Sequence, residues 1–400
     1  SLVDKSLVVV EDGAVQTRYR SPETIGEYAR DRLVESGEIE VMRARHAAYC
    51  LALADAWGLA LLDREQDNVR AALRWFEERG DVAAGVRLVR AMCEWWHQNG
   101  SPAEGKAWLE RFRSKPDFAN APLEVHARAL MAEIYLDTRH DPVAARASSE
   151  VLQALGRKAN NPEWQEFALV HLCWSSLELG ELSRAEGELA QYLAVARELE
   201  LPSAIAFAHI LLGDLARLRG EDDLARERYQ ASLVLSDESE KAWQLRSLGF
   251  LAIHRGATLE AESLLRESLS LARTLPNTLD KIECLGACAS LAAARGEEVR
   301  AARLLGAVDA ALKNVGLPFY FGDRFERART LDVLGDFVNE TDFADAAAEG
   351  RTMTLEQAIS YVMEGASGPP DPPPRSKKTP SYRASHPIPS CQPREGFLGD

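Results

Sequence analysis

The sequence has few cysteines, and they follow no pairing pattern. Six cysteines are spread over 400 residues, at positions 50, 93, 173, 284, 288 and 391. This irregular spacing predicts no disulfide framework. Cys284 and Cys288 are one helical turn apart in an alanine-rich segment, where we expect buried free thiols rather than a metal or redox pair.

Long apolar runs are also lacking. The longest one, residues 51–62, is interrupted by Asp55 and is too short to cross a bilayer. We therefore expect no membrane contact and no signal peptide. Together with the unpaired cysteines, this favours a reducing cytoplasm as the location.

Positive charge is in deficit. The chain carries 47 Lys and Arg against 62 Asp and Glu, so its formal net charge is −15 at pH 7. Proteins hold DNA largely by placing Lys and Arg against its phosphates. We therefore expect no direct DNA binding by these residues.

Recognisable catalytic and metal-binding patterns are lacking as well. The eight histidines are scattered, and His171 and Cys173 are two residues apart, which places them on different faces of a helix. Beyond residue 20 the pattern is helical, so no Ser-His-Asp order or Gly-rich dinucleotide turn can be placed on a strand. We predict that the segment is not an enzyme and contains no catalytic, cofactor-binding or metal-binding residues.

Residues 100–107 match a phosphate-binding P-loop, Gly-x4-Gly-Lys, except at the last position. A Ser or Thr hydroxyl should bind magnesium there, whereas Ala107 has none. A P-loop also follows a buried strand, but residues 88–97 predict a helix. We interpret the segment as a turn between helices in which Gly105 is a small packing residue.

The chain is organised around a sequence pattern that is repeated within residues 162–315. Each copy has an apolar helical run, a glycine turn and a second helical run. The turn glycines are 40, 36 and 40 residues apart, at Gly180, Gly220, Gly256 and Gly296. Alanine follows each glycine after five residues, at 185, 225, 261 and 301, and a bulky residue follows after nine, at Leu189, Tyr229, Leu265 and Leu305.

Repeats of this length are typical of helical-pair solenoids, in which each unit buries its apolar face against its neighbours. Glycine can end a helix in a left-handed cap, and the small residue lets the next helix approach closely. The same pattern extends upstream to Gly80, Gly100 and His140-Asp141. We therefore predict an all-α, tetratricopeptide-like solenoid over residues 37–315, with a period longer than the standard unit of about 34 residues.

The two ends of the chain differ from the repeat. β-prone runs on either side of Asp12-Gly13 predict a hairpin. Ser21 as N-cap and Pro22 at the first helical position predict the start of a helix. We interpret residues 1–36 as the end of a winged-helix module that begins outside this sequence. Residues 316–365 predict helices that cap the solenoid. Residues 366–400 hold nine of the 18 prolines and predict a disordered tail, either an authentic linker or the product of a reading-frame error.

Ordered motifs along residues 1–364 resemble the LuxR-type transcription regulators of the STAND class of ATPases. The matching segments are 18–20 (RYR), 23–29 (ETIGEYA), 45–49 (RHAAY), 67–75 (DNVRAALRW), 104–109 (EGKAWL), 301–307 (AARLLGA) and 348–355 (AEGRTMTL). The resemblance implies an upstream ATPase that uses ATP and magnesium, a tetratricopeptide-like arm, and a terminal helix-turn-helix. The ATPase and the helix-turn-helix are absent from these residues, so DNA would be read by a missing part.

The expected function is therefore the regulatory, sensor and protein-interaction arm of a cytoplasmic bacterial transcription regulator. An effector protein or a small molecule would bind on the solenoid. The alternative is a free-standing tetratricopeptide-like scaffold that binds a protein or peptide, which the hairpin and helix at residues 6–36 argue against. As groove residues for the ligand or partner we predict Trp96, Trp174 and Trp243, since the first helices of such pairs line the concave side.

Overall fold

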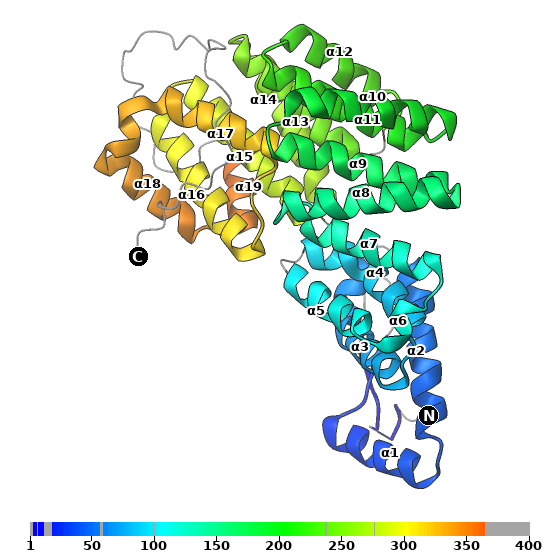
Figure 1. Ribbon diagram of the computed structural model, residues 1–400. Coiled ribbons are helices and arrows are strands. Elements are labelled where there is room, and N and C mark those ends of the chain that lie inside the picture. The colour runs from blue at the N-terminus through cyan, green and yellow to red at the C-terminus, as the bar shows by residue number, and fades with distance from the viewer. Residues whose placement is uncertain are drawn as a thin grey trace.

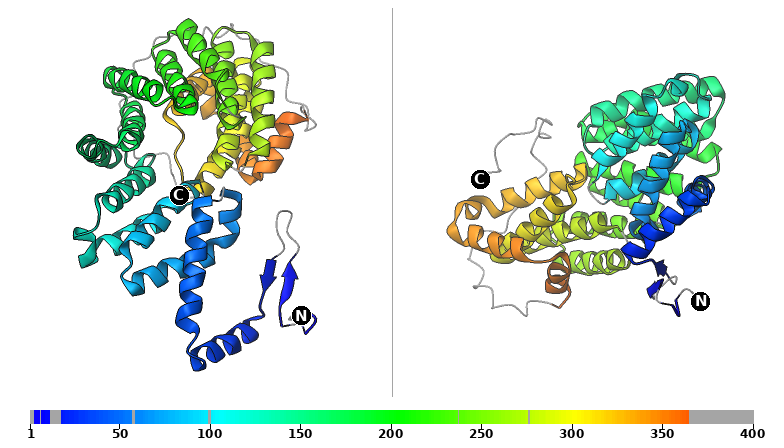
Figure 2. Two further views of the ribbon diagram at one scale, coloured as in Figure 1. Left: turned by 90° about the vertical axis from the view of Figure 1, so that its right-hand side faces the viewer. Right: turned by 90° about the horizontal axis from the view of Figure 1, so that it is seen from below.

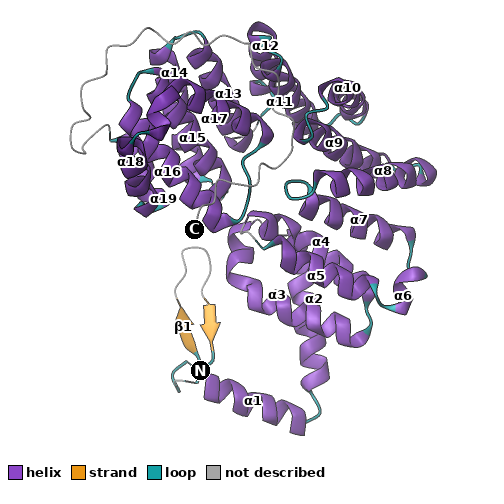
Figure 3. Cartoon of the chain, turned by 60° about the vertical axis from the view of Figure 1, so that its left-hand side comes forward, coloured by secondary structure: helices purple, strands orange, loops and turns teal. Residues whose placement is uncertain are grey.

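The computed structural model describes residues 3–5, 7–11, 18–56, 59–98, 101–236, 238–275 and 277–364. Within these ranges the chain forms 19 α-helices, one short 3-10 helix and one two-stranded hairpin (Figures 1 and 3). The predicted all-α class is confirmed. Successive helices pack in antiparallel pairs and curve into an arch (Figure 2, left).

The helices divide into an N-terminal group, the repeat and a C-terminal group. The N-terminal group is α1 (Glu23–Glu35), α2 (Ile39–Ala56), α3 (Leu59–Arg79), α4 (Val82–Gln98), α5 (Pro102–Arg113) and α6 (Pro116–Ala119). The repeat is α7 (Leu123–Asp137), α8 (Pro142–Ala159), α9 (Pro162–Glu178), α10 (Leu182–Glu198), α11 (Pro202–Leu218), α12 (Asp222–Leu233), α13 (Glu238–His254), α14 (Thr258–Thr274), α15 (Thr278–Ala294) and α16 (Glu298–Val315). The C-terminal group is α17 (Phe321–Leu334), the 3-10 helix η1 (Gly335–Asn339), α18 (Thr341–Thr352) and α19 (Leu355–Met363).

The glycine turns adopt the predicted left-handed conformation. The φ angles of Gly180, Gly220, Gly256 and Gly296 lie between 73° and 78°. At the first turn, the Gly180 N–H donates to the Leu177 carbonyl at 3.0 Å and the Glu181 N–H donates to the Ser176 carbonyl at 2.9 Å. This is a Schellman cap, and it satisfies carbonyls that the end of a helix would otherwise leave unpaired.

The residues after each turn pack as the repeat predicts. The alanines five positions on are fully buried, and so are the bulky residues nine positions on. A feature that the repeat analysis missed lies seven residues before the turn glycine, at Cys173, Gly213, Gly249 and Ala289. The residue there is always small, because the bulky residue of the second helix packs directly onto it. A Cβ on Gly213 would lie 2.5 Å from the Tyr229 ring, and one on Gly249 would lie 2.5 Å from Leu265.

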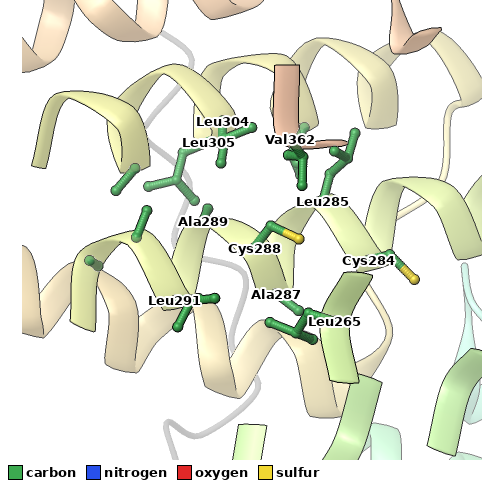
Figure 4. Close-up of a cluster of buried hydrophobic side chains, with 14 of the residues drawn as sticks. Leu265, Cys284, Leu285, Ala287, Cys288, Ala289, Leu291, Leu304, Leu305 and Val362 are labelled. Carbon is green, nitrogen blue, oxygen red and sulfur yellow. The ribbon is translucent and has the colours of Figure 1, made fainter. Parts of the chain in front are cut away.

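The core is continuous through the last repeats and into the C-terminal helices. Side chains of α14, α15, α16 and α19 form one cluster, part of which Figure 4 shows around Leu285, Leu304 and Val362. Cys284 and Cys288 are buried free thiols in this cluster, as predicted, and burial raises their pKa values to about 11 and about 12. The thiols therefore stay protonated at neutral pH and act as apolar packing groups.

The N-terminal hairpin stands apart from the arch (Figures 1 and 3). Strand β1 (Val9–Glu11) pairs antiparallel with β2 (Arg18–Arg20), so that Val10 lies opposite Tyr19. The predicted turn at Asp12-Gly13 lies outside the described residues. The prediction for the following helix was wrong by one residue, since Pro22 is the N-cap and no side chain caps the helix. Ser21 lies one residue too early for its hydroxyl to serve as that cap.

The C-terminal helices occupy two different places. α18 packs lengthwise on α16, where Gly306 and Gly350 allow the two backbones to touch. A Cβ on Gly306 would lie 2.1 Å from the Ala347 carbonyl oxygen, and one on Gly350 would lie 1.9 Å from that of Arg303. α17 instead turns back and packs against α15 and α11. The segment predicted as capping helices thus also covers part of the inner side of the arch.

Candidate ligand site in the concave face

The inner side of the arch holds a cavity of about 570 Å³. Its walls come from α4, α7, α9, α11, α13 and α15, together with Leu317 just before α17. Five of these helices are the first helices of repeat pairs, which is why residues from five units meet at one place. The volume lies within the range of small-molecule sites in proteins.

Aromatic rings form one wall of the cavity. α9, α11 and α13 contribute Trp174, Phe207 and Trp243 in turn, and all three line the cavity. The Trp174 and Phe207 rings stack at 6.1 Å between centroids, and the Trp243 ring meets each of them edge-on at 5.9 Å and 5.8 Å. Tyr320, from the segment before α17, packs behind both tryptophans at 4.9 Å and 4.8 Å. The C-terminal segment therefore fixes the rings that the repeat supplies.

A buried ion pair lies beside this wall. The Arg139 guanidinium, in the turn after α7, contacts the Glu283 carboxylate of α15 at 3.3 Å and donates to the Pro318 carbonyl at 3.4 Å. The other oxygen of Glu283 is 2.9 Å from the Arg246 guanidinium of α13. Arg139 also lies over the rings of Trp174 and Tyr320, at 5.7 Å and 5.8 Å from their centroids. The Arg139 cation and the Trp174 and Tyr320 rings thus already attract one another beside the cavity.

Burial shifts the pKa values of acidic groups in the cavity upward. Burial, and after it the neighbouring Glu283 carboxylate, raise the pKa of Asp280 to about 6, against the opposing pull of Arg246 and Arg139. Burial likewise raises the pKa of Glu94, on α4. Both shifts follow from the cost of holding a negative charge away from water.

Two histidines of the cavity are held neutral. Burial, and after it the positive charge of Arg139, lower the pKa of His97 to about 3. Burial, together with Arg90, lowers the pKa of His171 to about 3 as well.

The Nδ1 atom of His171 lies 3.0 Å from the Thr138 hydroxyl. The Nδ1 atom of His97 is buried without a hydrogen-bond partner, and so is the Nε1 atom of Trp174. Buried polar atoms without a partner are uncommon in proteins, and these two leave hydrogen-bonding positions open to a ligand.

A second buried network anchors α17 and is joined to the aromatic wall through Tyr320. Arg217 of α11 contacts Asp214 at 3.0 Å and Glu326 of α17 at 2.5 Å. The hydroxyls of Tyr229 and Tyr320 donate to the two oxygens of Asp214, at 2.6 Å and 2.9 Å. All of these charged side chains are at least 97% buried. A Cβ at Gly322 would lie 2.6 Å from the Arg217 guanidinium, so this glycine lets α17 begin where it does.

The structure brings together two of the three predicted groove residues. Trp174 and Trp243 both line the cavity, whereas Trp96 is 2% exposed and lies in the N-terminal core. Trp96 packs on Gly105, where an added Cβ would lie 2.8 Å from its ring. Sequence reasoning missed Arg139 and Tyr320. The aromatic run that follows Leu317-Pro318 was a signal, since such a run needs a buried surface to pack on.

The P-loop-like segment has the structure of a helix. Gly100 lies outside the described residues, but residues 102–113 form α5, which follows a helix rather than a strand. Lys106 is part of this helix and forms an ion pair with Asp137 of α7. Gly105 is the small packing residue that the repeat predicts.

The part of the chain that the structure describes brings no three His, Cys, Asp or Glu side chains into an arrangement that could hold a metal ion. Across the same residues, no helix is both long enough and apolar enough to span a membrane.

The chain is similar to proteins of Mycobacterium bovis and of two strains of Mycobacterium tuberculosis that are named as predicted HTH-type transcriptional regulators. Each is 33% identical to it over 178 residues, which covers 40% of this chain and 20% of the relative. The chain thus matches about a fifth of the length of these relatives. No model of a known protein family matches it.

Proposed function

We propose that this chain is the ligand-sensing arm of a transcription regulator of the LuxR-type, STAND-class kind, and that the concave cavity is its sensing site. The observation that carries the proposal is the cavity itself, which joins first helices from several units to the segment before α17. The similarity to longer proteins named as transcriptional regulators supports the regulatory role.

The architecture suits a sensor because a bound ligand contacts distant parts of the arch at once. His97 of α4 and Asp280 of α15 line the same cavity although 183 positions separate them in the sequence. A solenoid changes shape through small rotations between neighbouring units. A ligand that contacts both ends of the cavity therefore favours one curvature over others. The arm itself performs no chemistry in this proposal, and ATP and magnesium belong to a different part of the regulator.

Exposed side chains of the N-terminal hairpin and of α1 support the proposal that the arm is attached to another domain. α1 has no buried residue, and Tyr19 and Tyr28 are 69% and 61% exposed. Large apolar side chains left open in this way are typical of a surface that packs against another domain. In the proposal this domain is the rest of a winged helix, through which the arm transmits its state to the ATPase.

A promoter-reporter assay with the full regulator tests the proposal. Trp174→Ala removes part of the aromatic wall of the cavity, and we expect it to abolish induction by the natural effector while expression without effector is kept. Trp108→Ala is the matched control, because Trp108 is buried on α5 outside the cavity. An unchanged response in Trp174→Ala, at equal protein level, would contradict the proposal.

The coding DNA upstream of Ser1 separates the regulator from the free-standing scaffold. A continuous reading frame with an intact P-loop supports the regulator. A start codon close to Ser1 supports the scaffold.

A further inference from the structure

The charges that line the cavity are unbalanced. Among the residues that the structure describes, four carboxylates line it, from Glu94, Glu240, Asp280 and Glu283, against one guanidinium, that of Arg139. His97 and His171 add no positive charge at neutral pH, because burial lowers the pKa of each to about 3. A ligand in the cavity therefore faces an excess of negative charge.

Three guanidinium groups near the cavity do not reverse this excess. Arg139 and Arg246 both contact Glu283, and Arg246 also contacts the buried Asp323 at 3.3 Å. Arg90 lies over the Tyr135 and Phe167 rings, at 5.6 Å and 5.2 Å, and does not line the cavity. An anion that entered would meet Asp280 beside Glu283, where one negative charge already disfavours the other.

The aromatic wall favours the same sign of ligand. The faces of Trp and Tyr rings attract cations at centroid distances up to about 6 Å. Arg139 already makes such contacts with Trp174 and Tyr320. Because Trp174, Phe207 and Trp243 line the cavity as well, they offer an apolar surface for the body of a ligand next to the carboxylates.

The buried ring nitrogen of His97 suits a ligand that donates hydrogen bonds. This Nδ1 atom has no partner in the protein, and the neutral imidazole can present it as an acceptor. An ammonium or guanidinium group is a donor only, so it matches both this atom and the carboxylates.

We propose that the cavity binds a small organic cation, with an ammonium or guanidinium group on an apolar body. The cation lies near Asp280 and Glu283, and its apolar body packs on Trp174 and Trp243. This inference rests on the proposed sensing role of the cavity and adds the chemical class of the ligand.

Three probes of nearly equal shape test the sign of the ligand. They are 2-phenylethylamine, which is a cation at neutral pH, 2-phenylethanol, which is neutral, and phenylacetate, which is an anion. Binding to the whole chain is measured by ligand-observed saturation-transfer NMR. We expect the amine to bind at least about tenfold more tightly than the alcohol, and phenylacetate more weakly than either.

The Asp280→Asn variant tests whether the amine binds beside Asp280. It removes one charge at nearly constant shape, and we expect it to weaken binding of the amine about tenfold and to leave the alcohol unchanged. Asp345→Asn on the exposed side of α18 is the control, since it makes the same change of charge away from the cavity. The urea unfolding midpoint of each variant shows whether it is folded.

The pH dependence gives a second measurement that needs no variant to fold. Asp280 is faced by Glu283 on its own helix, by Arg246 from α13 and by Arg139 from the turn after α7. With its pKa at about 6, Asp280 loses its charge between pH 7 and pH 5, and binding of the amine should weaken over that range. Asp280→Asn should reduce this pH dependence and leave the part that comes from Glu94, whose pKa burial also raises.

The possible failures are distinguishable. Equal or tighter binding of the alcohol or of phenylacetate overturns the cation inference. Failure of the amine to bind, while induction in the reporter assay still depends on Trp174, overturns it as well and leaves the sensing role standing. If the amine does not bind and Trp174→Ala does not affect induction, both proposals fail.

Discussion

Gly213 and Tyr229 show how tightly the two helices of a repeat unit fit together. The Tyr229 ring packs on Gly213, and its hydroxyl is fixed by Asp214 at 2.6 Å and by Arg217 at 3.1 Å. The ring therefore cannot move aside for a larger neighbour. The small residue seven positions before each turn is thus as much a part of the repeat as the turn glycine.

Gly213→Ala should destabilise the protein although alanine favours helices. The added Cβ would lie 2.5 Å from the Tyr229 ring, and overpacking of this kind costs about 1–3 kcal/mol. The control is Gly187→Ala on α10, where an added Cβ meets nothing within 4 Å. That change should stabilise the helix by up to about 1 kcal/mol. Urea unfolding midpoints measure both, and an equal effect at the two sites would contradict the prediction.

His254 gives the fold a dependence on pH. Its Nδ1 atom lies 3.3 Å from the Asp222 carboxylate and its Nε2 atom 3.0 Å from that of Glu326, with the Arg329 guanidinium also close. Burial alone would lower the pKa of His254, but Glu326 and Asp222 outweigh it and the pKa is raised. A raised pKa means that the folded state holds the proton more tightly than the unfolded state does.

The stabilisation that protonated His254 provides is therefore complete below the ordinary histidine pKa of about 6.5 and is lost as the pH rises through the raised value. We expect the difference in unfolding free energy between the native protein and His254→Gln to be largest near pH 6 and to shrink towards pH 9. Urea unfolding at a series of pH values measures it. A difference that grew with pH would contradict the assigned direction.

At the scale of the elements, α17 is held to the arch by charged groups. Arg217 reaches Glu326 across 109 positions of sequence, and Arg324 pairs with Glu178 across 146. Such pairs are costly to bury, but breaking one by removal of a single partner leaves an uncompensated charge. The pairs therefore fix where α17 lies on the arch, and removing one partner of a pair should destabilise the fold.

Arg217→Met should be strongly destabilising, by about 3–5 kcal/mol, because Asp214 would lose its buried cation and Glu326 would keep only its contacts with His254 and Arg329. Adding Asp214→Asn in the same chain should recover part of the loss, because it removes the carboxylate charge that Arg217 balances. The control is Arg219→Met, which removes a partly exposed pair with Glu186 at 2.8 Å and should cost less than about 1 kcal/mol. Calorimetric or urea unfolding measures all three, and similar losses for the two arginines would contradict the prediction.

At the scale of the whole molecule, the sequence predicted what is local and repeated. The turn glycines and the buried alanines recur at fixed offsets, so a single unit explains all of them. Trp174 and Trp243 could be assigned to the concave side because every first helix of a pair faces it. The position of α17 could not be predicted in this way, because it does not recur and depends on pairs such as Arg217 with Glu326. Trp96 was predicted as a groove residue like the other two, but it lies in the N-terminal core. Its position in the sequence did not show this, because Trp96 packs on Gly105 of the following helix.

The ties between α17 and distant repeats also bear on how the chain folds. In a simple solenoid each unit contacts only its neighbours, so the structure can fray from one end and nucleate anywhere. Here Arg139 and Glu283 contact each other across 144 positions of sequence. α17 likewise packs on α11, which lies far before it in the sequence. Closing such long loops is slow, because chain entropy must be lost before the contact forms. The arch should therefore gain its final stability late, in one step that couples its first and last units, and lose it in the same cooperative way.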